Sequence, residues 1–197
     1  MDPSKFQLER EIVDRFLREL GYKDFSLSDP NAGQKADTGA DVLLYLDGRR
    51  YGIQVTLYHS DEGDTPTQRG SALRRQEALY KTWPTAYAMY GKPGPWGGLA
   101  YRLQSKCAKR CSIRTADELV LLVAASVPQT GAIVSTFLWD AAMDLNGMNT
   151  ILSPILMGSD FSSAYLYNMM GVGGASVYEW TRERGVWRKI PRSGYPT

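Results

Sequence analysis

The feature that most constrains the fold of this chain is an Asp-Gly pair between two apolar runs. Asp47 and Gly48 join VLLYL (42–46) to RRYGIQVTLY (49–58). Asp-Gly between runs of this kind is the strongest short-range signal for a β-hairpin, because both residues tolerate the backbone angles of a tight two-residue turn. The sequence therefore predicts an antiparallel strand pair whose register is set by the turn.

The predicted register brings polar residues together at the open end of the hairpin. If Leu46 lies opposite Arg49, Asp41 faces Gln54, and directly opposed residues have Cβ atoms about 4.5–5.5 Å apart on one face. Thr56 shares the face of Gln54 because strand side chains alternate. A carboxylate, an amide oxygen and a hydroxyl would converge, and hard cations such as Mg²⁺ prefer oxygen ligands. We therefore expect a cation site there.

Hydrophobic periodicity divides the rest of the chain into helices and strands. Apolar residues recur at helical spacing between a capping Ser4 and a terminating Gly21, which predicts a first helix. ELVLLVAAS (118–126) is continuously apolar, as in a central strand covered on both faces. We also expect helices over 68–83 and 98–111, helical stretches mixed with loop within 135–156, and strands over 85–90, 163–170, 175–180 and 186–190.

Composition indicates one domain over residues 1–197. The chain is 43% hydrophobic, enough for one sizeable core, and no Pro/Gly/Ser-rich linker divides it. Its two cysteines and single histidine, His59, exclude a zinc site of the usual Cys/His count. The longest apolar run, 119–127, is far shorter than the ~20 residues of a membrane span, and MDPSKFQLER lacks an apolar signal core. We expect a cytoplasmic protein without a membrane partner.

The order of elements around Asp41 resembles the PD-(D/E)XK phosphodiesterase superfamily, which includes many restriction endonucleases. That family has a helix, a polar loop, an aspartate at the head of a strand, a hairpin, and a strand carrying acidic-x-Lys. Here Asp41 matches the aspartate, Gln54 the second acidic residue, and Thr56 the lysine. Some branches similar to Mrr-type enzymes carry glutamine at the second position. The resemblance implies a Mg²⁺ or Mn²⁺ site with Asp41 and Gln54 as ligands, Glu11 of the first helix as a third, and Thr56 as a catalytic residue.

The resemblance covers about residues 5–126 and implies a restriction endonuclease-like α/β fold. In that fold a mixed central sheet is flanked by helices, and residues 127–197 would add a C-terminal strand-pair extension. QEALY is similar to the Gln-x-x-x-Tyr motif of the RecB-like and type I restriction branches. Basic residues at helical spacing suit phosphate contacts, although a solvated face is their ordinary explanation. The candidate DNA-binding residues are Arg74, Arg75, Gln76, Tyr80, Arg102, Lys106 and Lys109.

Each proposed site residue also has a purely structural interpretation. Asp41 can be a strand-entry aspartate, Gln54 a buried amide bonded to the main chain, Thr56 an ordinary β-former and Glu11 a solvated helix residue. In the C-terminal tail, tryptophans lie among arginines, a mixture that can stack bases, although core tryptophans are more common. These alternatives remain open at the level of the sequence.

Two functions fit these residues. The first is a Mg²⁺-dependent DNA phosphodiesterase in which the metal activates water without the motif lysine; His59 and Lys81 are candidates to replace that lysine. The second is a catalytically degenerate module of the same fold that binds DNA or a partner protein without cleavage. A homodimer fits either hypothesis, and the sequence does not decide between enzyme and binding module.

Overall fold

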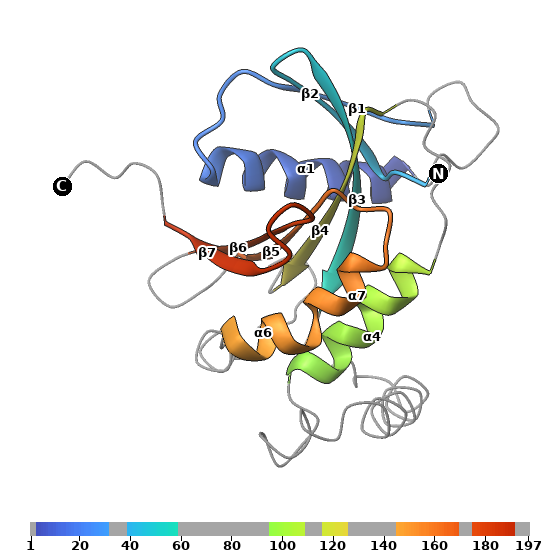
Figure 1. Cartoon of the computed structure of the whole chain (residues 1–197). Coiled ribbons are helices and arrows are strands. Elements are labelled where there is room, and N and C mark those ends of the chain that lie inside the picture. Colours follow the sequence, from blue (N-terminus) through green and yellow to red (C-terminus); the bar gives the residue numbers. More distant parts are fainter. Residues whose placement is uncertain are drawn as a thin grey trace.

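The computed structural model of the chain contains a β-sheet with helices packed on both of its faces (Figure 1). The α/β class and the helix-flanked mixed sheet expected from the sequence are confirmed. The structure describes residues 3–31, 39–58, 95–108, 116–125, 145–169 and 175–191. The helices of this part are α1 (Pro3–Glu19), α4 (Pro95–Cys107), α6 (Leu145–Ile151) and α7 (Ser153–Met157). Its strands are β1 (Ser26–Ser28), β2 (Val42–Leu46), β3 (Arg49–Tyr58), β4 (Glu118–Ala125), β5 (Ser163–Asn168), β6 (Ser176–Thr181) and β7 (Trp187–Ile190).

The described strands follow one another across the sheet in sequence order, from β1 at one edge to β7 at the other. The pairs β1–β2, β2–β3, β5–β6 and β6–β7 are antiparallel, whereas β3–β4 and β4–β5 are parallel. Parallel neighbours require a crossover connection. Helix α4 lies between β3 and β4 in the sequence, and α6 and α7 lie between β4 and β5.

The β2–β3 hairpin has the predicted register. Leu46 pairs with Arg49 next to the turn, and the pairing continues to Val42 opposite Ile53. The two central residues of the turn have φ of 51° and 77°. Positive φ at both positions is the requirement of a type I′ turn, which Asp-Gly satisfies. The turn chemistry therefore sets which residues of the two strands lie side by side.

Strand β4 is the central strand that its continuous apolar run predicts. It is parallel to both neighbours, and its side chains alternate between two separate cores. Leu119, Leu121 and Val123 belong to the core beneath α4, α6 and α7. Val120 and Leu122 belong to the core beneath α1. Both faces of β4 are thus covered by helices.

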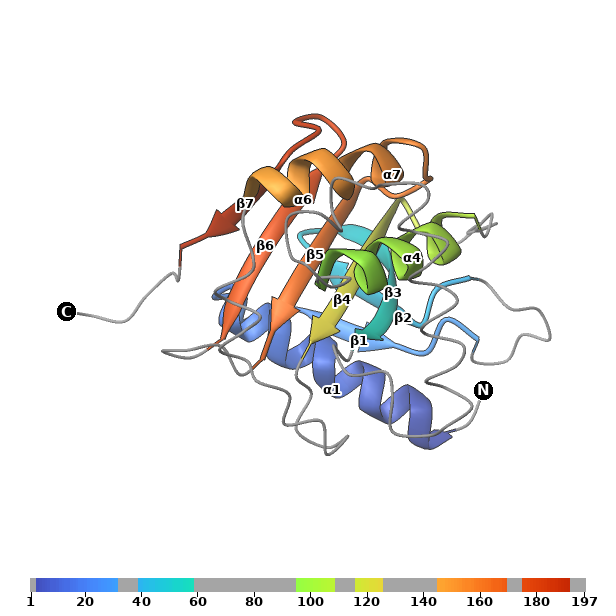
Figure 2. The ribbon, with the colours of Figure 1, turned by 90° about the horizontal axis from the view of Figure 1, so that it is seen from below.

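Helix α1 covers one face of the sheet and the other described helices cover the opposite face, as Figure 2 shows. The apolar stripe that predicts α1 is the part that packs: Ile12, Val13, Phe16 and Leu17 are all buried. Helices with one apolar stripe bury that stripe against the sheet. The first turns of α1 lie at the open end of the β2–β3 hairpin, where Lys5 contacts Asp41.

The predicted C-terminal strands are confirmed, and they belong to the same sheet. β5 is parallel to β4, and β6 and β7 extend the sheet beyond it by antiparallel pairing. Trp180 and Trp187 are 0% and 3% exposed and lie in the core with α6 and α7. Their rings are therefore core side chains, which removes the alternative that they stack on bases.

Some elements differ from the sequence predictions. The three-residue strand β1 was not expected, and it pairs with β2. The helix predicted over 98–111 begins at Pro95 and ends at Cys107. It can begin at Pro95 because proline is tolerated in the first turn of a helix. The helix predicted over 68–83 and the strand predicted over 85–90 lie outside the described residues.

Candidate functional site

Asp41 lies at the open end of the β2–β3 hairpin, one residue before β2 begins. Its N–H donates to the Ile53 carbonyl (2.8 Å), and its Oδ2 accepts from the Val55 N–H (2.9 Å). The carboxylate thus lies beside the part of β3 with which β2 would pair if β2 began earlier in the sequence. The predicted register places Asp41 directly opposite Gln54. The regular pairing of β2 with β3 ends at Val42, one residue before this pair would be reached.

Lys5 joins Asp41 to a second carboxylate, that of Glu9. The lysine Nζ lies 3.5 Å from Asp41 Oδ1 and 3.2 Å from Glu9 Oε1. The side chain of Lys5 is 57% exposed, whereas those of Glu9 and Asp41 are 7% and 15% exposed. Two nearly buried carboxylates therefore share one exposed ammonium group. We call Lys5, Glu9 and Asp41 the carboxylate cluster.

Glu9 is buried because it lies on the apolar stripe of α1. Ile12 and Val13 follow it by three and four positions, the spacing that places helical side chains on one face. Burial raises the pKa of Glu9, the charge of Asp41 raises it further, and the charge of Lys5 opposes both. The buried Oε2 of Glu9 has no hydrogen-bond partner within the described structure. A buried carboxylate oxygen without a donor is costly, so this atom is suited to bind a cation.

Lys5 stays charged in the cluster. Partial burial alone would lower its pKa, but the negative charges of Asp41 and Glu9 and their hydrogen bonds raise the pKa above its ordinary value. The ammonium group therefore neutralises part of the charge of two carboxylates that water reaches poorly.

Gln54 and Thr56 share one face of β3, as predicted, but this is the face opposite α1. The residues that alternate with them on β3 pack beneath α1. Gln54 Nε2 donates to the Gly39 carbonyl, which agrees with the interpretation of a buried amide bonded to the main chain. Thr56 Oγ1 is buried and has no hydrogen-bond partner among the described residues. The contacts of Asp41 join it to Lys5 of α1 and to the main chain of β3.

Glu11, the expected helix ligand, does not lie in the carboxylate cluster. Its side chain is exposed, and its Oε1 accepts a long hydrogen bond (3.4 Å) from Gln7 Nε2. A separation of two residues is a rotation of about 200° around an α-helix. Because Glu9 faces the sheet, Glu11 faces solvent. The α1 carboxylate that shares Lys5 with Asp41 is therefore that of Glu9, whereas the side chain of Glu11 lies outside the carboxylate cluster.

Lys106 of α4 is half-buried. Its positive charge lowers the pKa of Glu9, although less than Lys5 does. The role of Lys106 in binding DNA stays a prediction. The other predicted contacts fall outside the described structure: the side chain of Arg102 and the residues Arg74, Arg75, Gln76, Tyr80 and Lys109, together with His59 and Lys81.

The arginines of the C-terminal strands are engaged within the protein. Arg184 and Arg188 bind one carboxylate oxygen of Glu179, at 3.0 and 2.5 Å. The guanidinium group of Arg182 donates to main-chain carbonyls that precede β5. These contacts give the arginines a structural role in the C-terminal strands.

Replacing Glu9 with glutamine is expected to reduce the pH dependence of stability. Because the folded state raises the pKa of Glu9, its stabilising contribution is fully present below its unfolded pKa, near 4.5, and is lost as pH rises through the folded pKa. The free energy of unfolding of wild type minus that of Glu9→Gln should therefore fall as the pH rises from about 4.5 into the neutral range. Urea unfolding across this range measures the difference. A difference that is constant with pH would contradict the desolvation of Glu9.

The carboxylate cluster offers a metal ion two carboxylate side chains as ligands and no more. Among the described residues, no group of three or more His, Cys, Asp or Glu side chains is placed to hold a metal ion.

Within the described ranges, no helix has the length and apolar character needed to cross a membrane. Comparison of the chain with protein-family models, curated proteins and solved structures finds no match.

Proposed function

We propose that this protein is a divalent-metal-dependent DNA phosphodiesterase of the PD-(D/E)XK kind, with Mg²⁺ or Mn²⁺ held by Glu9 and Asp41. The order of elements supports the proposal: a helix, an antiparallel hairpin with an aspartate at its open end, and a parallel strand preceded by a further helix. The restriction endonuclease-like fold is part of this proposal.

The observation that carries the proposal is the pair of nearly buried carboxylates bound to one ammonium group. Because Lys5 Nζ contacts both Glu9 and Asp41, the folded chain provides a position for a cation between them. Mg²⁺ commonly binds one or two carboxylates and completes its shell with water and phosphate oxygens. Oε2 of Glu9, for which the described residues provide no hydrogen-bond partner, would be a further oxygen ligand of the ion. The residues present therefore fit a divalent ion.

A bound metal would lower the pKa of an attacking water and offset the charge that develops on the phosphate. The protein residues have distinct roles around it. The Val55 N–H fixes the carboxylate of Asp41, and burial fixes that of Glu9. Lys5, once displaced from the carboxylates, and Lys106 would bind the phosphate backbone. Gln54 would act as a positioning residue, because its amide holds Gly39, two residues before Asp41.

The direct test is cleavage of duplex and single-stranded DNA by the whole chain with Mg²⁺, with Mn²⁺, or with EDTA. Cleavage in either metal that EDTA abolishes supports the proposal. Retention of DNA on a gel without cleavage in any metal would contradict it.

A second function, a binding module without catalysis, is favoured by one observation. Lys5 already supplies a cation to both carboxylates, and the residue matched to the family's second acidic ligand is an amide, Gln54. In that case the Lys5 contacts are permanent and structural. DNA would then bind through Lys106 and other basic residues.

The substitution Lys5→Met separates these two functions through thermal stability. Loss of the ammonium group leaves Glu9 and Asp41 uncompensated, and we expect the metal-free protein to lose up to about 1 kcal/mol, since Lys5 is largely exposed. A divalent ion then has no competitor for the carboxylates. Saturating Mn²⁺ should raise the melting temperature more in Lys5→Met than in wild type.

The matched control for this comparison is Arg10→Met, an exposed cation on the same helix. Its melting temperature with and without Mn²⁺ should follow wild type. Equal responses of wild type and Lys5→Met to Mn²⁺ would show that Lys5 does not compete with a metal, which would favour the binding module.

A further inference from the structure

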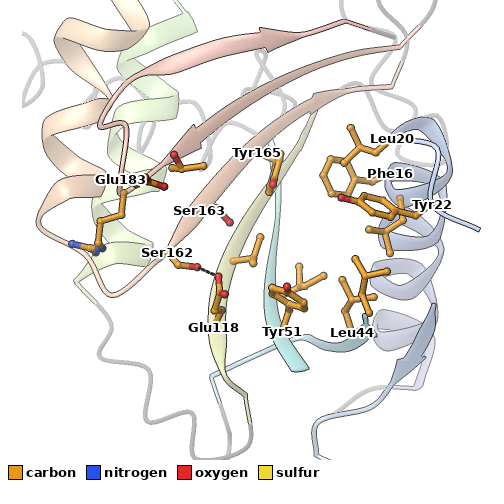
Figure 3. A pocket seen from close by; sticks show the side chains of 16 residues that line it. Phe16, Leu20, Tyr22, Leu44, Tyr51, Glu118, Ser162, Ser163, Tyr165 and Glu183 are labelled. Atoms are coloured by element: carbon orange, nitrogen blue, oxygen red, sulfur yellow. Dashed lines mark hydrogen bonds between the residues drawn. The ribbon is translucent and has the colours of Figure 1, made fainter. Parts of the chain in front are cut away.

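A cavity of about 630 Å³ lies on the α1 face of the sheet, beside the C-terminal half of α1 (Figure 3). Small-molecule sites usually occupy about 300–1,000 Å³. Tyr51, Glu118 and Ser163 line it near the beginnings of the parallel strands β3, β4 and β5. Leu17, also in the lining, follows Glu9 by eight residues, about 12 Å along the helix axis. The cavity is therefore separate from the carboxylate cluster.

Aromatic rings form much of the cavity wall. Phe16, Tyr22, Tyr51 and Tyr165 surround it, with leucine, isoleucine and valine side chains between them (Figure 3). The rings of Phe16 and Tyr165 pack with centroids 5.0 Å apart. The Tyr165 hydroxyl donates to Glu179 (3.1 Å), which fixes the ring. Burial and then the charge of Glu179 raise the pKa of Tyr165, so the cavity contains a neutral phenol.

Two of the three charged side chains that line this cavity are acidic. Glu118 and Glu183 line it. Glu118 accepts a hydrogen bond from Ser162 (3.1 Å), as Figure 3 shows, and its other oxygen binds Arg49 (3.2 Å), whose side chain is 67% exposed. Arg182 also lines the cavity, but its guanidinium group donates to three main-chain carbonyls. An anion would therefore meet two carboxylates and an engaged guanidinium.

We propose that this cavity binds a compact organic cation with an aromatic or apolar body. The aromatic wall buries such a body, and ring faces attract a cation. Glu118 and Glu183 attract the ammonium or amidinium group and repel anions, DNA phosphates included. The proposal does not depend on the metal site, because it uses other residues on another part of α1.

Three probes of similar shape and different charge test this site on the whole chain. Tryptamine carries an ammonium group, indole is neutral, and indole-3-acetate carries a carboxylate. Titration calorimetry or ligand-observed NMR should give a tryptamine affinity at least 10-fold above that of indole-3-acetate, with indole between them. Glu118→Gln/Glu183→Gln should reduce this preference to less than 3-fold.

Two single variants keep the test independent of folding defects. Glu183 is exposed, so Glu183→Gln alone should fold normally and weaken tryptamine binding by at least 3-fold. Glu19→Gln, on α1 outside the lining, should leave binding unchanged. The proposal is overturned if indole-3-acetate binds as tightly as tryptamine, if Glu183→Gln and the double variant bind tryptamine like wild type, or if no probe binds at millimolar concentration.

Discussion

Asp41→Asn and Glu9→Gln are each expected to lower Mn²⁺-dependent cleavage of DNA by more than about 100-fold, whereas Glu11→Gln leaves cleavage unchanged. Loss of a residue that only orients a metal ligand commonly costs about 10- to 100-fold in activity or metal affinity, so loss of a direct ligand costs more. Both amides keep an oxygen that can accept the hydrogen bonds of Val55 and Lys5. The loss would therefore reflect charge and not misfolding.

The three variants form a matched set because all exchange a carboxylate for an amide of the same shape. Glu9 and Glu11 lie two residues apart on α1, one in the cluster and one exposed. Far-ultraviolet circular dichroism and melting temperatures check that each variant folds. If Glu11→Gln abolished cleavage and Glu9→Gln did not, the assignment of Glu9 would fail. If Asp41→Asn cleaved DNA at the wild-type rate, the metal site would lie elsewhere.

The elements that could be predicted from the sequence are those with a strong local signal. The Asp-Gly turn gives both the hairpin and its register, because a two-residue turn allows few pairings. The continuous apolar run of β4 predicts a strand covered on both faces. Strand β1 has only three residues, with serine at both ends, and such a segment has no apolar alternation from which to predict it.

The burial of one glutamate of α1, Glu9, could have been predicted from the sequence. Glu9 precedes Ile12 and Val13 by three and four residues and thus lies in the apolar stripe, where a charged residue needs a partner. An acidic residue on the buried face of a helix is a stronger candidate for a site than one on the exposed face. Spacing alone distinguishes Glu9 from Glu11 in this helix.

The contacts of Asp41 could not be derived from the hairpin register. Ideal pairing places Asp41 opposite Gln54, but the main chain leaves the ladder one residue before β2, and the carboxylate takes the place of the next ladder acceptor at Val55. Its contact with Lys5 joins residues 36 positions apart. Such contacts depend on how α1 lies across the sheet, which local patterns do not encode.

Trp180→Ala is expected to destabilise the whole sheet by about 3–5 kcal/mol, the usual cost of deleting a large buried aromatic ring. Trp180 is fully buried, and β6 pairs it with Ala164 on one side and Trp187 on the other. The main-chain N–H of Trp187 donates to Asn149 Oδ1 of α6 (2.5 Å), so this part of the core joins strands to helix. Removing the ring would therefore loosen β5, β6 and β7 together.

Two further variants serve as comparisons for Trp180→Ala. Val186→Ala, at a residue 47% exposed in the turn before β7, should change the free energy of unfolding by less than about 0.5 kcal/mol. Trp180→Phe keeps most of the apolar surface and removes a buried indole N–H that has no hydrogen-bond partner among the described residues, so it should cost less than Trp180→Ala. Urea unfolding measures all three variants. If Trp180→Ala were as stable as Val186→Ala, the C-terminal strands would not share the core of the sheet, and their tryptophans would again be candidates for base stacking.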